Sequence, residues 1–471
     1  MKPSGESGPL LAGAAQVEIT PPAGTHVAGA VCSFRPAEVV LDPLYAKAVV
    51  LESEGQRIAL VSLDITIITE EWSARLREGA RKLGLDPTAV MVHAIQTHTA
   101  PGVGHFMLDP DFPALPAELE WVHGGQEAYA EFAIERATQA LEQALDALEP
   151  VQVAAGSALR DGLAFNRRAV MRDGSVSMLG SYSSIQYPLG PPGVRYAEGP
   201  TDPEVGVVCL RNSKLQMVAM LLHFSCHPVS LFPWPVISAD WPGTWAQGVQ
   251  ERFGPQCVGL VLNGSCGNLN PWQWLQPDVR SDHRVMGRAL AETTEKTVTT
   301  LNFSDGAQLD HRLTHLPIPL REMPPETRES VQKTMEEHPQ PVWSSQEPLV
   351  ADWEWFRAAS LWSVELARKR SPELLYEIQA FRVGDTALVG LPGEPFSEGQ
   401  LALKIASPTY PTYVAHCTSQ YVGYIPTREA ISRGGHEGTL SYWSKLAPEA
   451  LDMIVERSTE LLKEMFPGVR G

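Results

Sequence analysis

The sequence has little cysteine and no long apolar run. Six cysteines occur in 471 residues, none of them in a Cys-x-x-Cys pair, so we expect reduced thiols instead of a disulfide framework. No segment approaches the roughly 20 consecutive apolar residues that a membrane-spanning helix needs. Gly, Pro and Ser interrupt the N-terminal segment, where a signal peptide would need a continuous apolar stretch. We therefore expect a cytoplasmic protein without a membrane span.

The sequence also lacks an excess of positive charge. Its formal net charge is -18 at pH 7. Nucleic acids and anionic membranes attract basic surfaces, so we expect neither as a partner. Hydrophobic residues make up 44% of the chain and charged residues 20%, a composition typical of a folded globular protein with a sizeable core.

Strand-like and helix-like segments are interspersed along the whole chain. Apolar and β-branched runs predict strands at 45–52, 57–65, 88–95, 204–211, 216–225, 257–263, 374–384 and 386–393. Helical spacing of apolar residues predicts helices at 70–85, 126–148, 243–253, 282–298, 352–369, 395–406 and 446–464. Pro and Gly content predicts loops at 99–120, 185–203 and 335–350. This mixture predicts an α/β fold, a single large mixed α/β domain with a partly parallel sheet and helices packed on it.

Six of the apolar segments run into short polar motifs. These are HAIQTHTAPGVGH (93–105), LLHFSCHPVS (221–230), ISADWPG (237–243), VGLVLNGSCGNLNP (258–271), LVGLPGEPFSEGQ (388–400) and SQYVGYIPTREA (419–430). Polar groups at strand ends can converge on one crevice. Histidine, glutamate and tyrosine supply nitrogen and oxygen donors that suit zinc. The motifs therefore indicate a polar site, with a metal as one interpretation.

Each motif also has a structural explanation when it is taken alone. A histidine after a strand commonly makes hydrogen bonds within the protein, and Glu394 suits the start of a helix. Asp240 suits a turn or a helix cap. Gly264 and Gly267 would allow backbone N–H groups to approach a ligand, but they also suit a plain turn. Sequence spacing leaves both interpretations open.

Taken in order, the motifs resemble the N-terminal catalytic domain of the neutral/alkaline non-lysosomal ceramidases. The matching segments are AGAAQVEITPP, LDPLYAKAVVLE, ALVSLDI, QTHTAPG, CHP, ISADWPG, NGSCGNLNP, LPGEPF and YVGYIPTREA. The resemblance implies a zinc-dependent hydrolase of an amide bond, acting on a small-molecule N-acyl substrate for which a sphingolipid is one candidate. It implies that residues 1–471 are one ceramidase-like catalytic domain, without the C-terminal immunoglobulin-like domain of longer members.

The resemblance also implies a set of zinc ligands. His227, Glu394 and Tyr424 match the second histidine, the glutamate and the tyrosine of the family's site. The family's His-x-His reads Gln96-Thr97-His98 here, so only its second histidine is present. We expect His98 to complete the set. The alternatives are that Gln96 occupies the true ligand position, or that His93 or His105 replaces the missing histidine.

Other matched positions depart from the family pattern. The family serine is Asn270 here, the aspartate before it is Asn268, and the family tyrosine twelve residues after the zinc tyrosine is His436. We therefore expect a metal-activated water as the nucleophile, with His436 or Asp240 accepting its proton. Arg167, with Arg168 as the alternative match, or N–H groups of the 264–268 loop would then meet the oxyanion. Gln96, Gly264, Gly267 and Asn268 are expected to face the substrate.

Two other functions remain open at this level. The replacements at Gln96, Asn268 and Asn270 fit a degenerate member that binds a ligand without turnover. Cys266 lies on a glycine-rich loop and Cys226 adjoins His227, which fits a thiol hydrolase if a nearby positive charge lowers the thiol pKa. The sequence does not determine the acyl chain, the amine, the metal or the oligomeric state.

Overall fold

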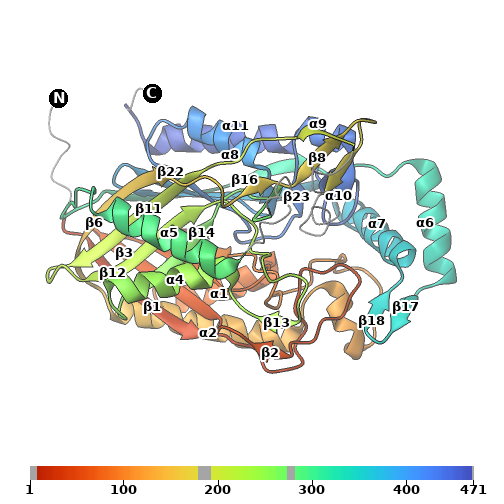
Figure 1. Cartoon of the computed structure of the whole chain (residues 1–471), viewed down its shortest axis with the longest axis horizontal. Helices are drawn as coiled ribbons and strands as arrows, with labels where there is room; N and C mark the ends of the chain where they lie inside the picture. Colours follow the sequence, from red (N-terminus) through yellow and green to blue (C-terminus); the bar gives the residue numbers. More distant parts are fainter. Residues whose placement is uncertain (1–7, 179–192, 273–281, 469–471) are drawn as a thin grey trace.

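The structure is a computed structural model that describes residues 8–178, 193–272 and 282–468. Its largest sheet has eight strands in the order β14-β12-β11-β6-β1-β3-β4-β5 (Figure 1). Their bounds are β1 Leu11–Glu18, β3 Tyr45–Ser53, β4 Gln56–Leu63, β5 Val90–Ala94, β6 Glu149–Leu159, β11 Glu204–Asn212, β12 Met217–Phe224 and β14 Val258–Asn263. The β4–β5 and β12–β14 pairs, at the two edges, are parallel, and the other pairs are antiparallel. The expected partly parallel sheet is confirmed.

The two ends of this sheet approach each other. Ser62 in β4 donates a hydrogen bond to the carbonyl of Val261 in β14 (3.0 Å), and the N–H of Asn263 donates to Nε2 of His93 in β5 (3.1 Å). The sheet is therefore strongly curved. The curvature brings the segments that follow β5, β12 and β14 into one region.

A second sheet of four strands packs on the first. Its order is β16-β19-β20-β22, with bounds β16 Leu309–Pro319, β19 Glu373–Val383, β20 Thr386–Gly390 and β22 Thr412–Ala415. The β20–β22 pair is parallel. One buried cluster joins the two sheets: Val49, Leu51, Leu60, Leu221 and Leu260 meet Phe381, Leu388 and Tyr413. Alternating residues of each strand face opposite sides, so each sheet also presents a second apolar face.

Helices cover those outer faces (Figure 1). The large sheet carries α1 Glu70–Lys82, α2 Glu127–Asp146, α4 Asp240–Phe253 and α5 His283–Val298. The small sheet carries α8 Ser397–Ala406 and α11 Ala450–Met465. The result is a helix–sheet–sheet–helix arrangement, and the expected α/β class is confirmed. None of the helices within the described ranges combines the length and apolar character that crossing a membrane requires.

Several elements differ from the sequence expectations. The segment 335–350, expected to be a loop, contains the end of α6 Pro325–Glu337 and the strand β17 Trp343–Gln346, which pairs with β18 Leu349–Ala351. These elements form one end of the molecule together with α7 Trp353–Arg370 (Figure 1). Trp343 and other apolar side chains in the segment pack against Trp355 and Phe356 of α7, and this packing overrides its high Pro content. Part of the expected loop at 185–203 lies outside the described residues, and its end holds β10 Val194–Ala197.

Candidate active site

One cavity of about 430 Å³ collects most of the residues that the sequence analysis singled out. Its walls include Gln96, His98, Arg167, Asn270, Glu394, Tyr424 and His436. Glu394 belongs to β21 Glu394–Pro395, which pairs in parallel with β23 Tyr424–Ile425, so Glu394 and Tyr424 lie opposite each other. His227 follows β12. It does not line the cavity itself, but it contacts Glu394, which does. The motifs at the strand ends therefore meet at one place.

The His227–Glu394 contact is the most informative feature of this cavity. Nδ1 of His227 lies 2.6 Å from the carbonyl of Cys266 and 3.1 Å from that of Leu269, so it carries the proton, because a carbonyl only accepts. Nε2 then faces Oε2 of Glu394 at 3.1 Å, and both side chains are buried. In neutral His227, Nε2 is an acceptor, and so is the carboxylate. This geometry requires a proton or another cation between the two atoms.

The carboxylate of Glu394 is held in its charged form. Its Oε1 accepts a hydrogen bond from the hydroxyl of Tyr421 (2.8 Å). Burial alone would raise the pKa of Glu394, but the hydrogen bond and charge of His227, the charge of Arg167 and the Tyr421 hydroxyl together lower this pKa to about 2. The carboxylate of Glu394 therefore stays ionised at neutral pH.

His98 lines the cavity next to this pair. Its ring centre is 5.6 Å from that of His227 and 5.9 Å from that of Phe232. Burial, and then repulsion from His227, lowers the pKa of His98 to about 3, which leaves a neutral imidazole, the form that binds metals. A Cβ atom on Gly29 would lie 2.5 Å from Nδ1 of His98. Only glycine allows the chain to approach the ring so closely.

The nitrogen and oxygen donors of His98, His227, Glu394 and Tyr424 suit zinc in their chemistry, although they do not form a complete metal-binding cluster. Two atoms that are each about 2 Å from a tetrahedral zinc are about 3.3 Å apart, close to the 3.1 Å between His227 and Glu394. A hydrogen bond from Nδ1 to a carbonyl commonly fixes the tautomer and the ring orientation of a histidine that binds a metal through Nε2. However, the described ranges contain no group of three or more His, Cys, Asp or Glu side chains placed to hold a metal ion.

The two tyrosines of the YVGY segment have different surroundings. Tyr421 is the one that hydrogen-bonds Glu394. The Tyr424 ring lies 5.5 Å from the guanidinium carbon of Arg167 and 5.4 Å from the His436 ring. The family resemblance implies Tyr424 as the ligand and gives no role to Tyr421, because spacing alone does not show which hydroxyl reaches the carboxylate.

Of the two candidate arginines, Arg167 is the one that lines the cavity. Its Nε donates to Oε1 of Glu437 (2.7 Å) and its Nη1 to Oδ1 of Asn270 (3.2 Å). The Tyr424 hydroxyl interacts with the same guanidinium, and Nη2 is buried without a partner of good hydrogen-bond geometry within the described part of the chain. Arg168 points away, to Glu198 and to Oε2 of Glu437 (2.6 Å). Glu437 thus holds both arginines, a role that sequence reasoning missed although the residue adjoins His436.

Four predicted residues contribute scaffold contacts instead of cavity walls. Asp240 accepts N–H bonds from Trp241 (2.7 Å) and Leu231 (3.2 Å) and does not line the cavity. The N–H groups of Gly264 and Gly267 donate to the carbonyls of Phe224 and Pro395, so they are not free to meet an oxyanion. The amide of Asn268 bonds to the N–H of Ser397 and to Glu398.

The remaining histidine and cysteine candidates also lie off the cavity. His93 is bonded to the carbonyl of His416 (2.6 Å) and to the N–H of Asn263, and His105 pairs with Glu120. Cys266 lies with its Sγ 3.4 Å from Nδ1 of His416, and it is fully buried. Burial raises the pKa of the Cys266 thiol well above its ordinary value, which opposes a nucleophilic role.

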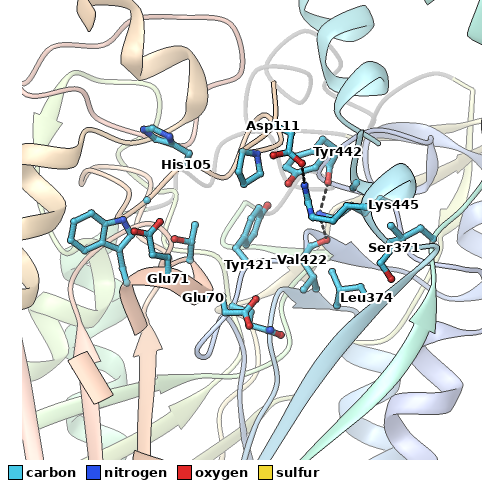
Figure 2. A pocket seen from close by; sticks show the side chains of 18 of the residues that line it. Glu70, Glu71, His105, Asp111, Ser371, Leu374, Tyr421, Val422, Tyr442 and Lys445 are labelled. Atoms are coloured by element: carbon cyan, nitrogen blue, oxygen red, sulfur yellow. Dashed lines mark hydrogen bonds and ion pairs between the residues drawn. The ribbon is translucent and has the colours of Figure 1, made fainter. Parts of the chain in front are cut away.

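A second cavity, of about 690 Å³, lies on the other side of Tyr421. Figure 2 shows Tyr421 between the carboxylates of Glu70 and Glu71 and the Tyr442–Lys445 side of this cavity. Nζ of Lys445 donates to the carbonyls of Val422 (3.2 Å) and Tyr442 (2.9 Å). Tyr421 lines both cavities, so its ring forms part of the wall between them.

Comparisons with known proteins agree with the fold. No protein-family model and no curated protein matches the sequence. The neutral ceramidase from Pseudomonas aeruginosa superposes with a TM-score of 0.70 and 20% sequence identity, covering 98% of this chain and 75% of that chain. A ceramidase complexed with C2 gives a TM-score of 0.69 at 17% identity, covering 98% of this chain and 76% of that chain. The chain therefore has the ceramidase fold, as the sequence motifs implied.

Proposed function

We propose that this protein is a zinc-dependent hydrolase that cleaves the amide bond of an N-acyl substrate with a water molecule. The observation that carries the proposal is the buried contact between Nε2 of His227 and Oε2 of Glu394, two acceptor atoms that require a proton or a metal cation between them. The ceramidase fold supports an amide as the bond that is cleaved. We assign His227, Glu394, His98 and Tyr424 as the residues that would hold the metal.

The other cavity residues have roles that follow from their positions. A bound zinc ion would lower the pKa of its water to about 7 and polarise the substrate carbonyl. His436 lines the cavity beside Tyr424, where it can accept a proton from the attacking water. Arg167 lines the cavity with a guanidinium whose positive charge can stabilise the oxyanion that develops on the carbonyl. Asn270 orients Arg167 through its Oδ1.

The apolar part of the cavity suits the acyl chain of the substrate. Phe106, Met107, Val229, Phe232 and Trp443 contribute to its walls. A pocket of this kind holds an apolar group by burial and uses a few polar groups for orientation. A sphingolipid remains one candidate substrate within this class.

Metal content tests the proposal directly. We expect about one zinc per chain by mass spectrometry of protein purified without a His-tag, and loss of that zinc in His227→Ala. The matched control is His311→Ala, which removes a histidine that lies near Asp86 and away from the cavity. A wild-type protein that stays metal-free after incubation with zinc, or that hydrolyses N-acyl amides equally well in the presence of a chelator, would contradict the proposal.

A second candidate function is binding of an N-acyl ligand without turnover. It is favoured by the absence of a three-residue His/Cys/Asp/Glu group among the described residues and by Gln96 and Asn270 in the cavity wall. Tight binding of an N-acyl amide, with no hydrolysis at any zinc loading in single-turnover experiments, would select this function over the first.

A further inference from the structure

Arg35 is a buried arginine that lines the same cavity and has no acidic partner. It is 7% exposed, and no carboxylate of residues 8–178, 193–272 or 282–468 forms an ion pair with it. Its Nη2 donates to the carbonyls of Ala28 and His98 (3.0 Å to His98), and its guanidinium carbon lies 5.0 Å from the centre of the Phe232 ring. Nε and Nη1 have no partner within the described residues. Three N–H donors are therefore left on one charged group.

Such an arrangement is costly unless something binds there. Burial lowers the pKa of Arg35 to about 10, so the guanidinium keeps its charge at pH 7. A buried charge normally has a counter-ion, because removing it from water costs several kcal/mol. Three other buried cations follow the rule, since Lys47 pairs with Asp64 and both Arg167 and Arg168 pair with Glu437, whereas Lys445 binds only carbonyls and burial lowers its pKa to about 8.

The charges around the cavity do not supply the missing partner. Glu394 is engaged with His227 and Tyr421, and Glu437 is shared between two other arginines. Arg35 lies beside His98, whose carbonyl it binds, whereas Arg167 lies beside Tyr424. The cavity thus has a second, uncompensated positive group at a distance from the oxyanion-binding arginine. An anionic group on a bound molecule would compensate it.

We propose that Arg35 recognises a carboxylate on the substrate, so that the preferred substrates are N-acyl compounds with an acidic group, such as N-acyl amino acids. This inference rests on the proposed amide hydrolysis and specifies its substrate class. Arg35 is a binding residue in this assignment. The apolar walls hold the acyl chain, the amide lies near Glu394 and Arg167, and the carboxylate reaches Arg35.

The test compares two probes that share the acyl-glycine part and differ in the charge of the terminal group. Binding of N-hexanoylglycine and of its neutral methylamide to the wild-type protein is measured by calorimetry, which needs no turnover. We expect the carboxylate to bind at least about 10-fold more tightly, because hydrogen bonds to a charged group contribute about 1.5–3 kcal/mol, which is about 10–100-fold. In Arg35→Gln we expect carboxylate binding to fall by about 10–100-fold and binding of the methylamide to stay within about 3-fold.

Arg382→Gln is the matched control. Arg382 also donates only to carbonyls, of Gly384 (2.8 Å) and Met465 (2.9 Å), and also stacks on a phenylalanine, Phe466 at 4.5 Å. It does not line either cavity, so its replacement should leave both affinities unchanged. If Arg35→Gln does not fold, two measurements still test the role of Arg35. One is the comparison of the two probes on the wild-type protein. The other is Arg35→Lys, which keeps the charge and should retain part of the preference for the carboxylate.

The outcomes separate this inference from the proposed function. Equal affinity of the wild-type protein for the two probes, or an unchanged preference in Arg35→Gln, overturns the role of Arg35. Hydrolysis of neutral amides in preference to N-acyl amino acids also overturns it, while the hydrolase function stands. Arg35-dependent binding of the carboxylate without cleavage at any metal loading overturns the hydrolase function and leaves the recognition role intact.

Discussion

Replacing Glu437 with glutamine removes the carboxylate that Arg167 and Arg168 share. Glu437 is 1% exposed, and its two oxygens accept from Nε of Arg167 (2.7 Å) and from Nη1 of Arg168 (2.6 Å). The glutamine amide can accept from only one of them and turns an N–H₂ group toward the other. Glu437→Gln therefore leaves a buried guanidinium facing a donor.

The size of the effect follows from burial. Removing one partner of a buried ion pair costs about 3–5 kcal/mol. Unfolding entropy is about 2.1 cal/mol/K per residue, or about 1 kcal/mol/K for a chain of this length, so we expect the melting temperature to fall by about 3–5 °C at pH 7. Arg167 also loses the group that orients it, and a displacement of about 1 Å can lower kcat/KM by about 100-fold.

The pH dependence of this effect has a definite sign. Burial alone would raise the pKa of Glu437, but the charges of Arg167, His436 and Arg168 and the hydrogen bond from Arg168 lower it from 4.5 to about 2. A lowered carboxyl pKa contributes stability that is fully present above about pH 4.5 and is lost as the pH falls toward 2. The difference in melting temperature between the wild-type protein and Glu437→Gln should therefore close over this window.

Differential scanning calorimetry measures both effects. The control is Glu449→Gln, which also removes a glutamate bound to an arginine, Arg428 at 2.9 Å, but at an exposed pair; such pairs are worth about 0–1 kcal/mol. If Glu437→Gln melts within about 1 °C of the wild-type protein at pH 7, or if the two substitutions have equal effects, the argument from burial is wrong.

Three further predictions concern the cavity and its surroundings. Gly29→Ala should abolish most amide hydrolysis because the new Cβ would lie 2.5 Å from Nδ1 of His98. The control Gly55→Ala has a similar positive φ and no atom within 4 Å of the new Cβ, so it should only lower stability, by about 1–2 kcal/mol. Equal losses of activity in the two variants would refute the clash. Iodoacetamide should not label Cys266 in the native protein, and Cys266→Ala should keep its hydrolytic activity, because burial raises the thiol pKa well above its ordinary value; a labelled Cys266 peptide in a mass spectrum would revive the thiol alternative. Gln96→Ala should lower turnover by about 10–100-fold with the zinc content unchanged; loss of zinc in this variant, with His98→Ala still loaded, would move the ligand assignment to Gln96.

The sequence by itself determined the local features. Apolar periodicity located most strands and helices, and the ordered motifs pointed to the ceramidase fold that the structural comparison confirms. It also selected the residues whose strand ends converge, and His98, Glu394, Tyr424 and His436 do line one cavity. The strands and helices could be predicted because each depends on residues close together in the chain. The cavity residues lie far apart in the sequence and were implied by the ordered family resemblance.

Only the tertiary structure decided which of two similar neighbours faces the site. Arg167 lines the cavity and Arg168 does not. Tyr421 and Tyr424 both line it, but the hydroxyl that bonds to Glu394 is that of Tyr421. It also revealed Glu437 as the shared partner of two arginines about 270 positions away, and Arg35 as a buried charge beside His98. Ion pairs and orphaned donors are set by distances and burial between remote segments, and the curvature of the sheet, which brings β5 and β14 together, creates those distances.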